Sequence, residues 1–165
     1  AHRVPLVEGV LGADSDAALA QQVCALFAAH GKKPVLVQRD IPGFLANRIQ
    51  HALMREVLSL IDSGIASPED VDLAVRYSLG FRYAAIGPVL QKEISGWDTQ
   101  AAAAREIYPS LCNSTELPAC LTQLLAEGRT GMKRGAGFID WTPEAAQALR
   151  ADYDRRLAAA LKLLD

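Results

Sequence analysis

A change of pattern at Pro42-Gly43 constrains this sequence more than any other feature. Before it, residues 4–10 and 33–38 are short runs rich in β-branched side chains, and a stretch with apolar residues at helical spacing joins them. After it, every strongly periodic segment has helical spacing. The sequence therefore predicts a mainly α fold, in which residues 41–165 form a helical domain and residues 1–40 form a β-α-β unit.

The β-α-β unit is expected to be part of a larger sheet. Asp14 or Ser15 is predicted to cap its helix, and Gly31 is predicted to end it as a left-handed residue. Two parallel strands alone would leave both edges unpaired and one face uncovered. Residues 1–40 are therefore expected to need further strands and helices beside them.

Helix signals follow one another in the second part. Residues 44–63 carry a wide apolar stripe, which predicts a buried central helix. Ser67 before Pro68 and two acidic residues is a strong helix start, and Gly80 is predicted to end that helix. Further helices are predicted to start at Gly87-Pro88 and to cover residues 100–107, 117–127 and 143–164, the last capped by Thr142.

Composition excludes several classes of protein. The chain has 165 residues, 50% of them hydrophobic, and no run approaches the roughly 18 apolar residues of a membrane span. Three cysteines without Cys-x-x-Cys spacing and three scattered histidines predict neither a metal site nor a disulfide framework. The net charge of −2, with dispersed basic residues, predicts no nucleic-acid partner. A cytoplasmic protein without a membrane segment is expected.

Five short motifs occur in a fixed order along the chain. They are a strand that ends at Glu8, Pro42-Gly43-Phe44 followed by Asn47-Arg48, Ser67-Pro68-Glu69-Asp70, a turn from Leu79 to Gly87-Pro88, and a glycine-rich element from Gly131 to Phe138. This order resembles the 3-hydroxyacyl-CoA dehydrogenases and their lambda-crystallin-like relatives. The resemblance implies that residues 1–40 end an NAD-binding Rossmann domain and that residues 41–165 form the helical substrate-binding and dimerisation domain.

The resemblance implies an oxidoreductase of fatty acid metabolism, in which hydride passes between a 3-hydroxyacyl-CoA and NAD. The Gly-x-Gly-x-x-Gly loop that holds the pyrophosphate of NAD does not occur in this sequence, nor does the family's catalytic His. The chain is therefore expected to be the C-terminal portion of a longer enzyme, inactive by itself, whose N-terminal domain binds most of the NAD.

Two residues are implied to be catalytic. Glu8 would orient the family's His base, and its alternative role is that of an ordinary solvated or helix-contacting Glu at a strand end. Asn47 would hold the reacting oxygen beside the nicotinamide, so that it contacts both substrate and cofactor. Its alternative role is that of an exposed or cap-like Asn in a helix.

Two further residues are candidates for substrate binding. Arg82 is a candidate to bind a substrate carboxylate in bidentate fashion, although an ion pair at the surface or between domains is at least as good an interpretation. Lys133, with Arg134 beside it, is a candidate ligand for a phosphate of coenzyme A, although such glycine-rich segments more often form packing turns. Trp97 and Trp141 are most simply interpreted as core residues.

The motifs support two substrates and one non-catalytic alternative. The turn around Arg82 resembles the free hydroxy acid branch, whereas residues 96–99 and the glycine-rich element resemble the acyl-CoA branch, which is favoured. Leu90 stands where the family usually has a Glu, which weakens the assignment. The long apolar helix faces also predict a homodimer through the helical domain, and a dimerisation or substrate-recognition module without catalysis is the other interpretation.

Overall fold

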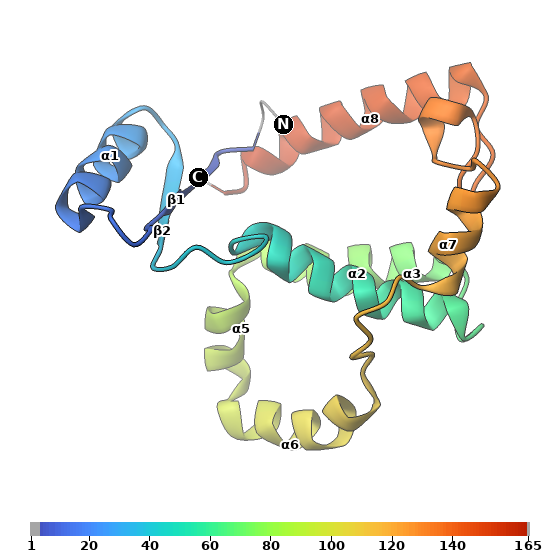
Figure 1. The fold of residues 1–165 in the computed structure, drawn as a ribbon, viewed down its shortest axis with the longest axis horizontal. Coiled ribbons are helices and arrows are strands. Elements are labelled where there is room, and N and C mark those ends of the chain that lie inside the picture. Colours follow the sequence, from blue (N-terminus) through green and yellow to red (C-terminus); the bar gives the residue numbers. More distant parts are fainter. Residues whose placement is uncertain (1–3, 165) are drawn as a thin grey trace. The chain divides into compact units, whose positions relative to one another are not determined.

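The structure is a computed structural model that describes residues 4–164 (Figure 1). Its elements are β1 (Leu6–Val10), α1 (Ala17–Ala29), β2 (Lys33–Val37), α2 (Ala46–Asp62), α3 (Pro68–Val75), the π-helical turn η1 (Arg76–Gly80), α4 (Phe81–Ala85), α5 (Pro88–Ser95), α6 (Trp97–Ile107), the 3-10 turn η2 (Tyr108–Ser110), α7 (Ala119–Ala126), the 3-10 turn η3 (Met132–Arg134) and α8 (Pro143–Leu161). The predicted class, mainly α with an initial β-α-β unit, is confirmed.

The chain divides into two compact units, residues 1–54 and 55–165. The division falls inside α2, where the first turns of the helix belong to one unit and the remaining turns to the other. The predicted boundary between residues 40 and 41 separates two domains of a longer protein, not two compact units of this chain, and it stays a prediction.

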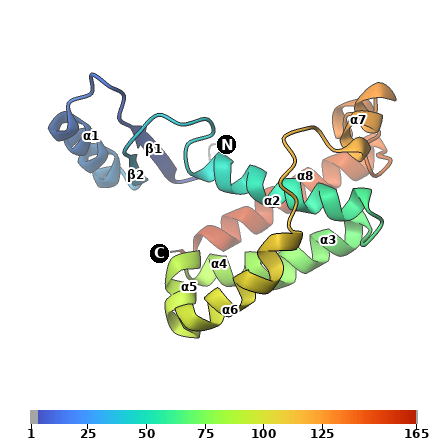
Figure 2. The same ribbon diagram turned by 60° about the horizontal axis from the view of Figure 1, so that its bottom comes forward.

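In the first unit, β1 and β2 pair in parallel from Leu6 opposite Lys33 to Val10 opposite Val37, and α1 covers one face of the pair (Figure 2). The prediction that Asp14 or Ser15 caps α1 is wrong. Asp16 is the cap, and its Oδ1 accepts hydrogen bonds from the second and third amides of the helix. Ser15 is engaged in the preceding turn, where its Oγ accepts from the amide of Gly12 at 2.9 Å.

In the second unit, α3 begins as predicted, because the Ser67 Oγ accepts from the amide of Asp70 at 3.1 Å. Gly80 does not end this helix. The helical backbone passes through η1 into α4 and ends at Ile86, whose backbone is extended. Gly80 has a helical φ of −61°, and a Cβ there would lie 2.9 Å from the carbonyl oxygen of Val75. Glycine therefore permits the wide turn to pass rather than stopping the helix.

The prediction of a buried central helix over residues 44–63 is wrong for this chain alone. No residue of α2 is buried, and Ile49 is 67% exposed. Among the described residues, the buried hydrophobic positions are Val37, Val71 and Ala146. Helices α3 to α6 contact mainly their neighbours in sequence, and large apolar side chains such as Phe81 and Ile94 stay exposed, at 72% and 77%.

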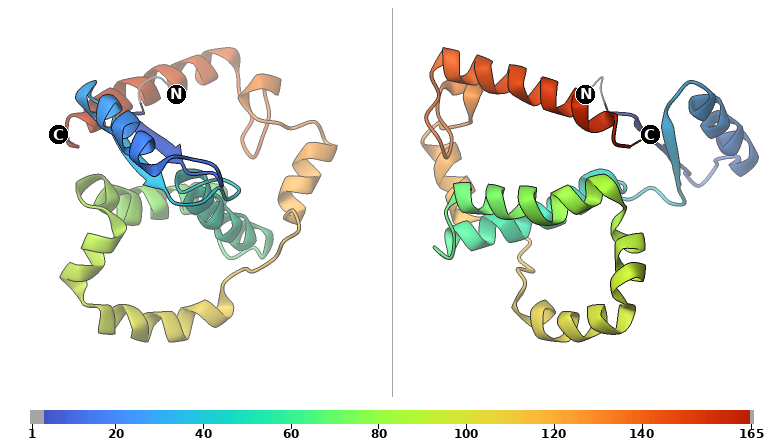
Figure 3. Two further views of the ribbon diagram at one scale, coloured as in Figure 1. Left: turned by 60° about the vertical axis from the view of Figure 1, so that its left-hand side comes forward. Right: turned by 180° about the vertical axis from the view of Figure 1, so that it is seen from behind.

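Trp97 is likewise not a core residue, because it is 49% exposed. Its indole Nε1 donates to Glu93 Oε1 at 2.6 Å, one helical turn earlier in the chain, across the junction between α5 and α6. The polar end of the indole is therefore used to join two consecutive helices. At the far end of the chain, Thr142 caps α8 as predicted, and α8 runs as one uninterrupted helix (Figure 3).

Acidic side chains on α2 hold the long segment between α6 and α7. Glu56 Oε2 accepts from the amide of Cys112 at 2.8 Å. The Asp62 carboxylate accepts from the amides of Ala119 and Cys120, at 2.8 and 2.6 Å, and so satisfies two free amides at the start of α7. The Cys120 side chain and these backbone bonds hold the pKa of Asp62 below its usual value. Burial, with Asp62 beside it, raises the pKa of the Cys120 thiol to about 11.

We expect Asp62→Asn to loosen the start of α7, because an amide side chain offers one acceptor oxygen where the carboxylate offers two. Hydrogen exchange at Ala119 and Cys120 should become severalfold faster. Since the pKa of Asp62 is lowered in the folded chain, its stabilising contribution is complete above about pH 4 and is lost as the pH falls further. Asp72→Asn, at an exposed position on α3, is the control; equal exchange in both variants would contradict the assigned role.

Within residues 4–164, no helix is both long enough and apolar enough to cross a membrane. The three cysteines are free thiols, and the described His, Cys, Asp and Glu side chains form no group suited to a metal ion. The cytoplasmic location stays a prediction.

Candidate functional site

The carboxylate of Glu8 lies at the N-terminus of α2. Its Oε1 accepts hydrogen bonds from the amides of Leu45 and Ala46, at 2.7 and 3.1 Å. These amides have no partner within their own helix, so a residue distant in sequence supplies the cap. A negative charge at this end also interacts favourably with the helix dipole. Glu8 is the central residue of β1, which runs on to Val10, so the prediction that the strand ends at Glu8 is wrong; the strand is thereby attached to the helix that carries Asn47.

The Pro-Gly breaker makes this attachment possible by turning the chain sharply. Gly43 has φ of 81° and Phe44 has φ of 46°, and Phe44 is the one non-glycine residue with positive φ among those described. The amide of Phe44 donates to the carbonyl of Ile41, and the amide of Arg48 donates to that of Gly43, both at 3.0 Å. Backbone strain of this kind occurs where the surrounding structure fixes a conformation, frequently at functional sites.

Glu8 has acceptor capacity to spare. Among the described residues, its Oε2 accepts no hydrogen bond, and the side chain is only partly exposed. Glu8 also lines a cavity of about 530 Å³ between β1 and α1. Glu8 therefore does contact a helix, as its alternative role predicted. This contact uses Oε1 and leaves Oε2 able to accept a hydrogen bond from a further donor.

Asn47 is the second residue of α2 and directly follows Ala46, whose amide Glu8 binds. It is exposed, and its side-chain amide makes no hydrogen bond to any described residue. The structure thus brings Glu8 to the turn of helix that carries Asn47. The catalytic roles of both residues stay predictions.

We expect Glu8→Ala to cost about 1 kcal/mol of stability, because it leaves two helix amides without their acceptor. Hydrogen exchange at Leu45 and Ala46 should accelerate, while exchange within α8 should not change. Asp14→Ala removes an exposed carboxylate from the same unit and serves as the control. Unchanged exchange at the start of α2 would show that the cap contributes nothing.

The two predicted substrate-binding residues lie on separate elements of the second unit. Arg82 is an exposed residue of α4, and Lys133 is an exposed residue of η3. Neither forms an ion pair with a described residue. A surface ion pair for Arg82 therefore has no partner within residues 4–164, and an ion pair between domains stays a prediction. Their roles in binding stay predictions.

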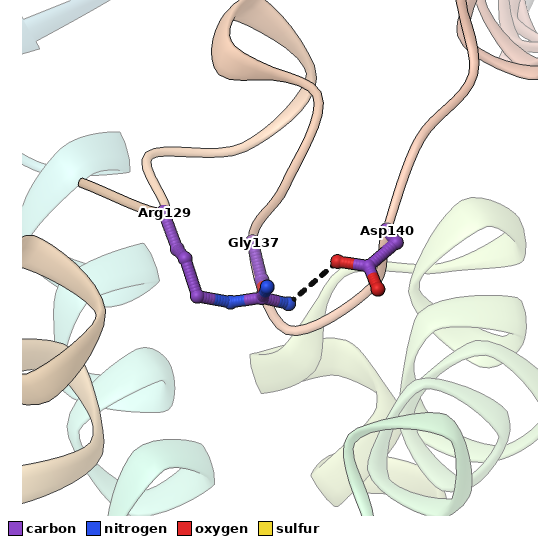
Figure 4. Close-up of polar contacts among 3 residues, drawn as sticks. All are labelled: Arg129, Gly137 and Asp140. Atoms are coloured by element: carbon purple, nitrogen blue, oxygen red, sulfur yellow. Dashed lines mark hydrogen bonds and ion pairs between the residues drawn. The ribbon is translucent and has the colours of Figure 1, made fainter. Parts of the chain in front are cut away.

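The glycine-rich element is a tight turn held by Arg129, a residue that the sequence analysis did not single out. The Arg129 guanidinium donates to the carbonyl of Gly137 at 2.6 and 3.0 Å and pairs with Asp140 at 2.8 Å (Figure 4). A Cβ on Gly137 would lie 3.1 Å from the Cα of Gly131, so the backbone at the two ends of the turn passes close together. The packing interpretation of these glycines therefore has a structural basis, and Lys133 lies at the exposed end of the turn.

Comparison with known proteins defines the family. A family model for the C-terminal domain of 3-hydroxyacyl-CoA dehydrogenase matches residues 43–141, which is more than half of the chain. The chain belongs to this family.

Individual relatives match over nearly all of the chain. The 5-formyl-3-hydroxy-2-methylpyridine 4-carboxylate 5-dehydrogenase of Mesorhizobium japonicum is 30% identical over 99% of the chain, which covers 53% of that protein. The L-carnitine dehydrogenase of Nocardiopsis dassonvillei is 34% identical over 99% of the chain and 50% of the relative. The chain thus spans about half the length of the curated relatives it matches.

Solved structures show the same relationship. The crystal structure of a 5-formyl-3-hydroxy-2-methylpyridine 4-carboxylic acid 5-dehydrogenase, described as an NAD+-dependent dismutase, matches with a TM-score of 0.95 at 30% identity, over 99% of this chain and 53% of that one. A 3-hydroxyacyl-CoA dehydrogenase from Archaeoglobus fulgidus matches with a TM-score of 0.59 at 27% identity, over 98% of this chain and 56% of that one.

Proposed function

We propose that the intact protein is an NAD-dependent dehydrogenase that interconverts a hydroxyl group and a carbonyl group on an acidic organic substrate. The carbon gives up its hydrogen as hydride to the nicotinamide, the hydroxyl proton passes to a base, and a C=O bond forms. The observation that supports the proposal is the hydrogen bond from the amide of Ala46 to the Glu8 carboxylate, in the turn of α2 that also carries Asn47.

In this proposal, the residues of the chain position groups that react. Glu8 holds α2 with one oxygen and presents the other to the imidazole of a His base, whose tautomer and orientation it fixes. Asn47 donates from its amide to the reacting oxygen, which stabilises the charge that develops there. The Gly-x-Gly-x-x-Gly loop is not in these residues, so the pyrophosphate of NAD does not fit on this chain alone and belongs to another domain of the intact protein.

For the substrate we propose a small free acid. The two relatives that match over 99% of the chain are named for a pyridine carboxylate and for carnitine, both of which carry a free carboxylate. Arg82, exposed and without an ion-pair partner among residues 4–164, supplies a guanidinium suited to bidentate carboxylate binding. The second candidate is a 3-hydroxyacyl-CoA, which the family model and the Archaeoglobus fulgidus relative support.

We expect Asn47→Ala in the intact protein to lower kcat about a hundredfold, the scale typical for loss of one positioned donor. NADH formation should be measured with carnitine, 3-hydroxybutyrate and 3-hydroxybutyryl-CoA as substrates, because only a free-acid enzyme prefers the first two. Gln50→Ala removes an exposed amide from the same helix and is the control. Unchanged kcat in Asn47→Ala would remove Asn47 from the site, and turnover of the thioester alone would overturn the free-acid assignment.

We also propose that the helical unit forms a homodimer. Several of its large apolar side chains are exposed, among them Tyr77 at 70%, Phe81 at 72% and Ile94 at 77%. Leu90, 59% exposed, lies one helical turn before Ile94 on α5, so the two share a face. Contiguous apolar faces of this kind mark interaction surfaces, and a second copy of the same chain is the commonest occupant.

We expect Ile94→Asp to shift the chain from dimer to monomer at micromolar concentration, because a buried carboxylate without a partner is costly in an interface. Sedimentation equilibrium gives the mass directly. Thr99→Asp, at an exposed position in the first turn of α6, adds the same charge and should leave the dimer intact. Monomeric behaviour of the unsubstituted chain would rule out the dimer.

A further inference from the structure

The first half of α2 presents two faces of different composition. Ile49 and Leu53 lie one helical turn apart on an apolar side of the helix. On the opposite side, Asn47, His51 and Met54 follow one another at spacings of four and three residues, and all three are exposed. Ligand-binding surfaces combine apolar side chains with a few polar groups in the same way, whereas packing faces are apolar throughout.

His51 has no partner within the described chain. It is exposed, and neither nitrogen of its ring forms a hydrogen bond or an ion pair with any of residues 4–164. His30 differs in this respect, because its Nδ1 lies 2.8 Å from the carbonyl oxygen of Leu26, one helical turn earlier. An imidazole carries at least one N–H donor in either protonation state. His51 therefore has a donor available for a molecule that approaches this face of α2.

The position of this donor relative to Asn47 is fixed. Both residues belong to the same compact unit as Glu8, whose carboxylate accepts from the first amides of α2. Arg48 Nη1 also lies 3.5 Å from the carbonyl oxygen of Pro42, which ties the start of the helix to the turn before it. Asn47 and His51 are thus separated by one helical turn, about 5.4 Å along the axis. Donors held on one rigid helix lose little freedom when a ligand binds.

We propose that His51 determines which substrate the intact protein accepts, by binding the carboxylate of a 3-hydroxy acid. Asn47 donates to the hydroxyl oxygen that reacts, and His51 donates from its ring to the carboxylate of the same molecule, one turn further along α2. The spacing fits a 3-hydroxy acid, because a single CH2 group separates its carbinol carbon from its carboxylate. A carboxylate has two oxygens with about four lone-pair sites, so it accepts from His51 and from Arg82 together.

This role rests on the proposed dehydrogenase activity, because it requires the reacting oxygen to lie at Asn47. It goes beyond that activity in assigning a residue that selects the substrate without taking part in hydride transfer. A hydrogen bond to a charged acceptor is about twice as strong as one to a neutral acceptor. His51 therefore favours a free acid over a thioester or an amide, whose carbonyl carries no charge.

The test is steady-state kinetics of the intact protein, with the better substrate of carnitine and 3-hydroxybutyrate and with the carboxamide of the same acid. His51→Leu should raise KM for the acid about tenfold, while KM for the carboxamide and kcat for both change much less. His51→Gln keeps an N–H donor and should retain most of the affinity for the acid. Gln50→Leu, an equally exposed polar residue beside His51, is the matched control and should leave KM unchanged.

The outcomes separate this role from the proposed function. Unchanged KM for the acid in His51→Leu, or an equal rise for acid and carboxamide, would overturn the role of His51 and leave the dehydrogenase standing. A fall in kcat at constant KM would also overturn it, because it would place His51 at the reacting atoms. Absence of NADH formation from either acid by the unsubstituted protein would defeat the proposed free-acid activity and this role with it. Hydrogen exchange at Leu45 and Ala46 should be the same in all variants, which shows that the helix start is intact.

Discussion

The bond from Glu8 to the first amides of α2 is the contact on which the arrangement of the candidate site depends. It joins the middle of β1 to a helix start across 37 positions of sequence, and it uses an ionised acceptor where the helix has free donors. The turn at Gly43 and Phe44 brings the helix to the carboxylate. A catalytic role for Glu8 would therefore use a side chain whose position is already fixed by a structural one.

A second helix of the chain is capped in the same way by a carboxylate distant in sequence. Asp62 satisfies the first amides of α7 as Glu8 satisfies those of α2, and Glu56 holds the connecting segment at Cys112. With few hydrophobic side chains buried among the described residues, these long-range polar contacts carry much of the tertiary organisation. They also explain why substitution of single carboxylates should be felt locally, at the helix starts, rather than throughout the chain.

Local signals were sufficient for most elements. Ser67 and Thr142 were predicted as caps and are caps. In each case the side-chain hydroxyl accepts a hydrogen bond from a first-turn amide, and the following proline favours the first position of a helix. Two predictions failed because a contact with a residue three to five positions earlier in the chain competed with the expected rule. Gly80 was read as a stop, yet it supplies room for a wide turn against Val75, and Ser15 lost its cap role to Asp16 because its hydroxyl binds Gly12. The prediction of a buried α2 assumed a covering layer that this chain does not itself provide.

By itself, the sequence determined the order and type of the elements, the breaker at Pro42-Gly43 and membership of the family, because these depend on local propensities and on motifs in a fixed order. Only the tertiary structure decided that Glu8 binds α2, that Arg129 holds the glycine-rich turn, and that Lys133, Trp141 and Arg150 line one cavity. Each of these contacts joins residues whose spacing has no helical or strand period. Chain reversal in three dimensions brings them together, and no local pattern encodes that reversal.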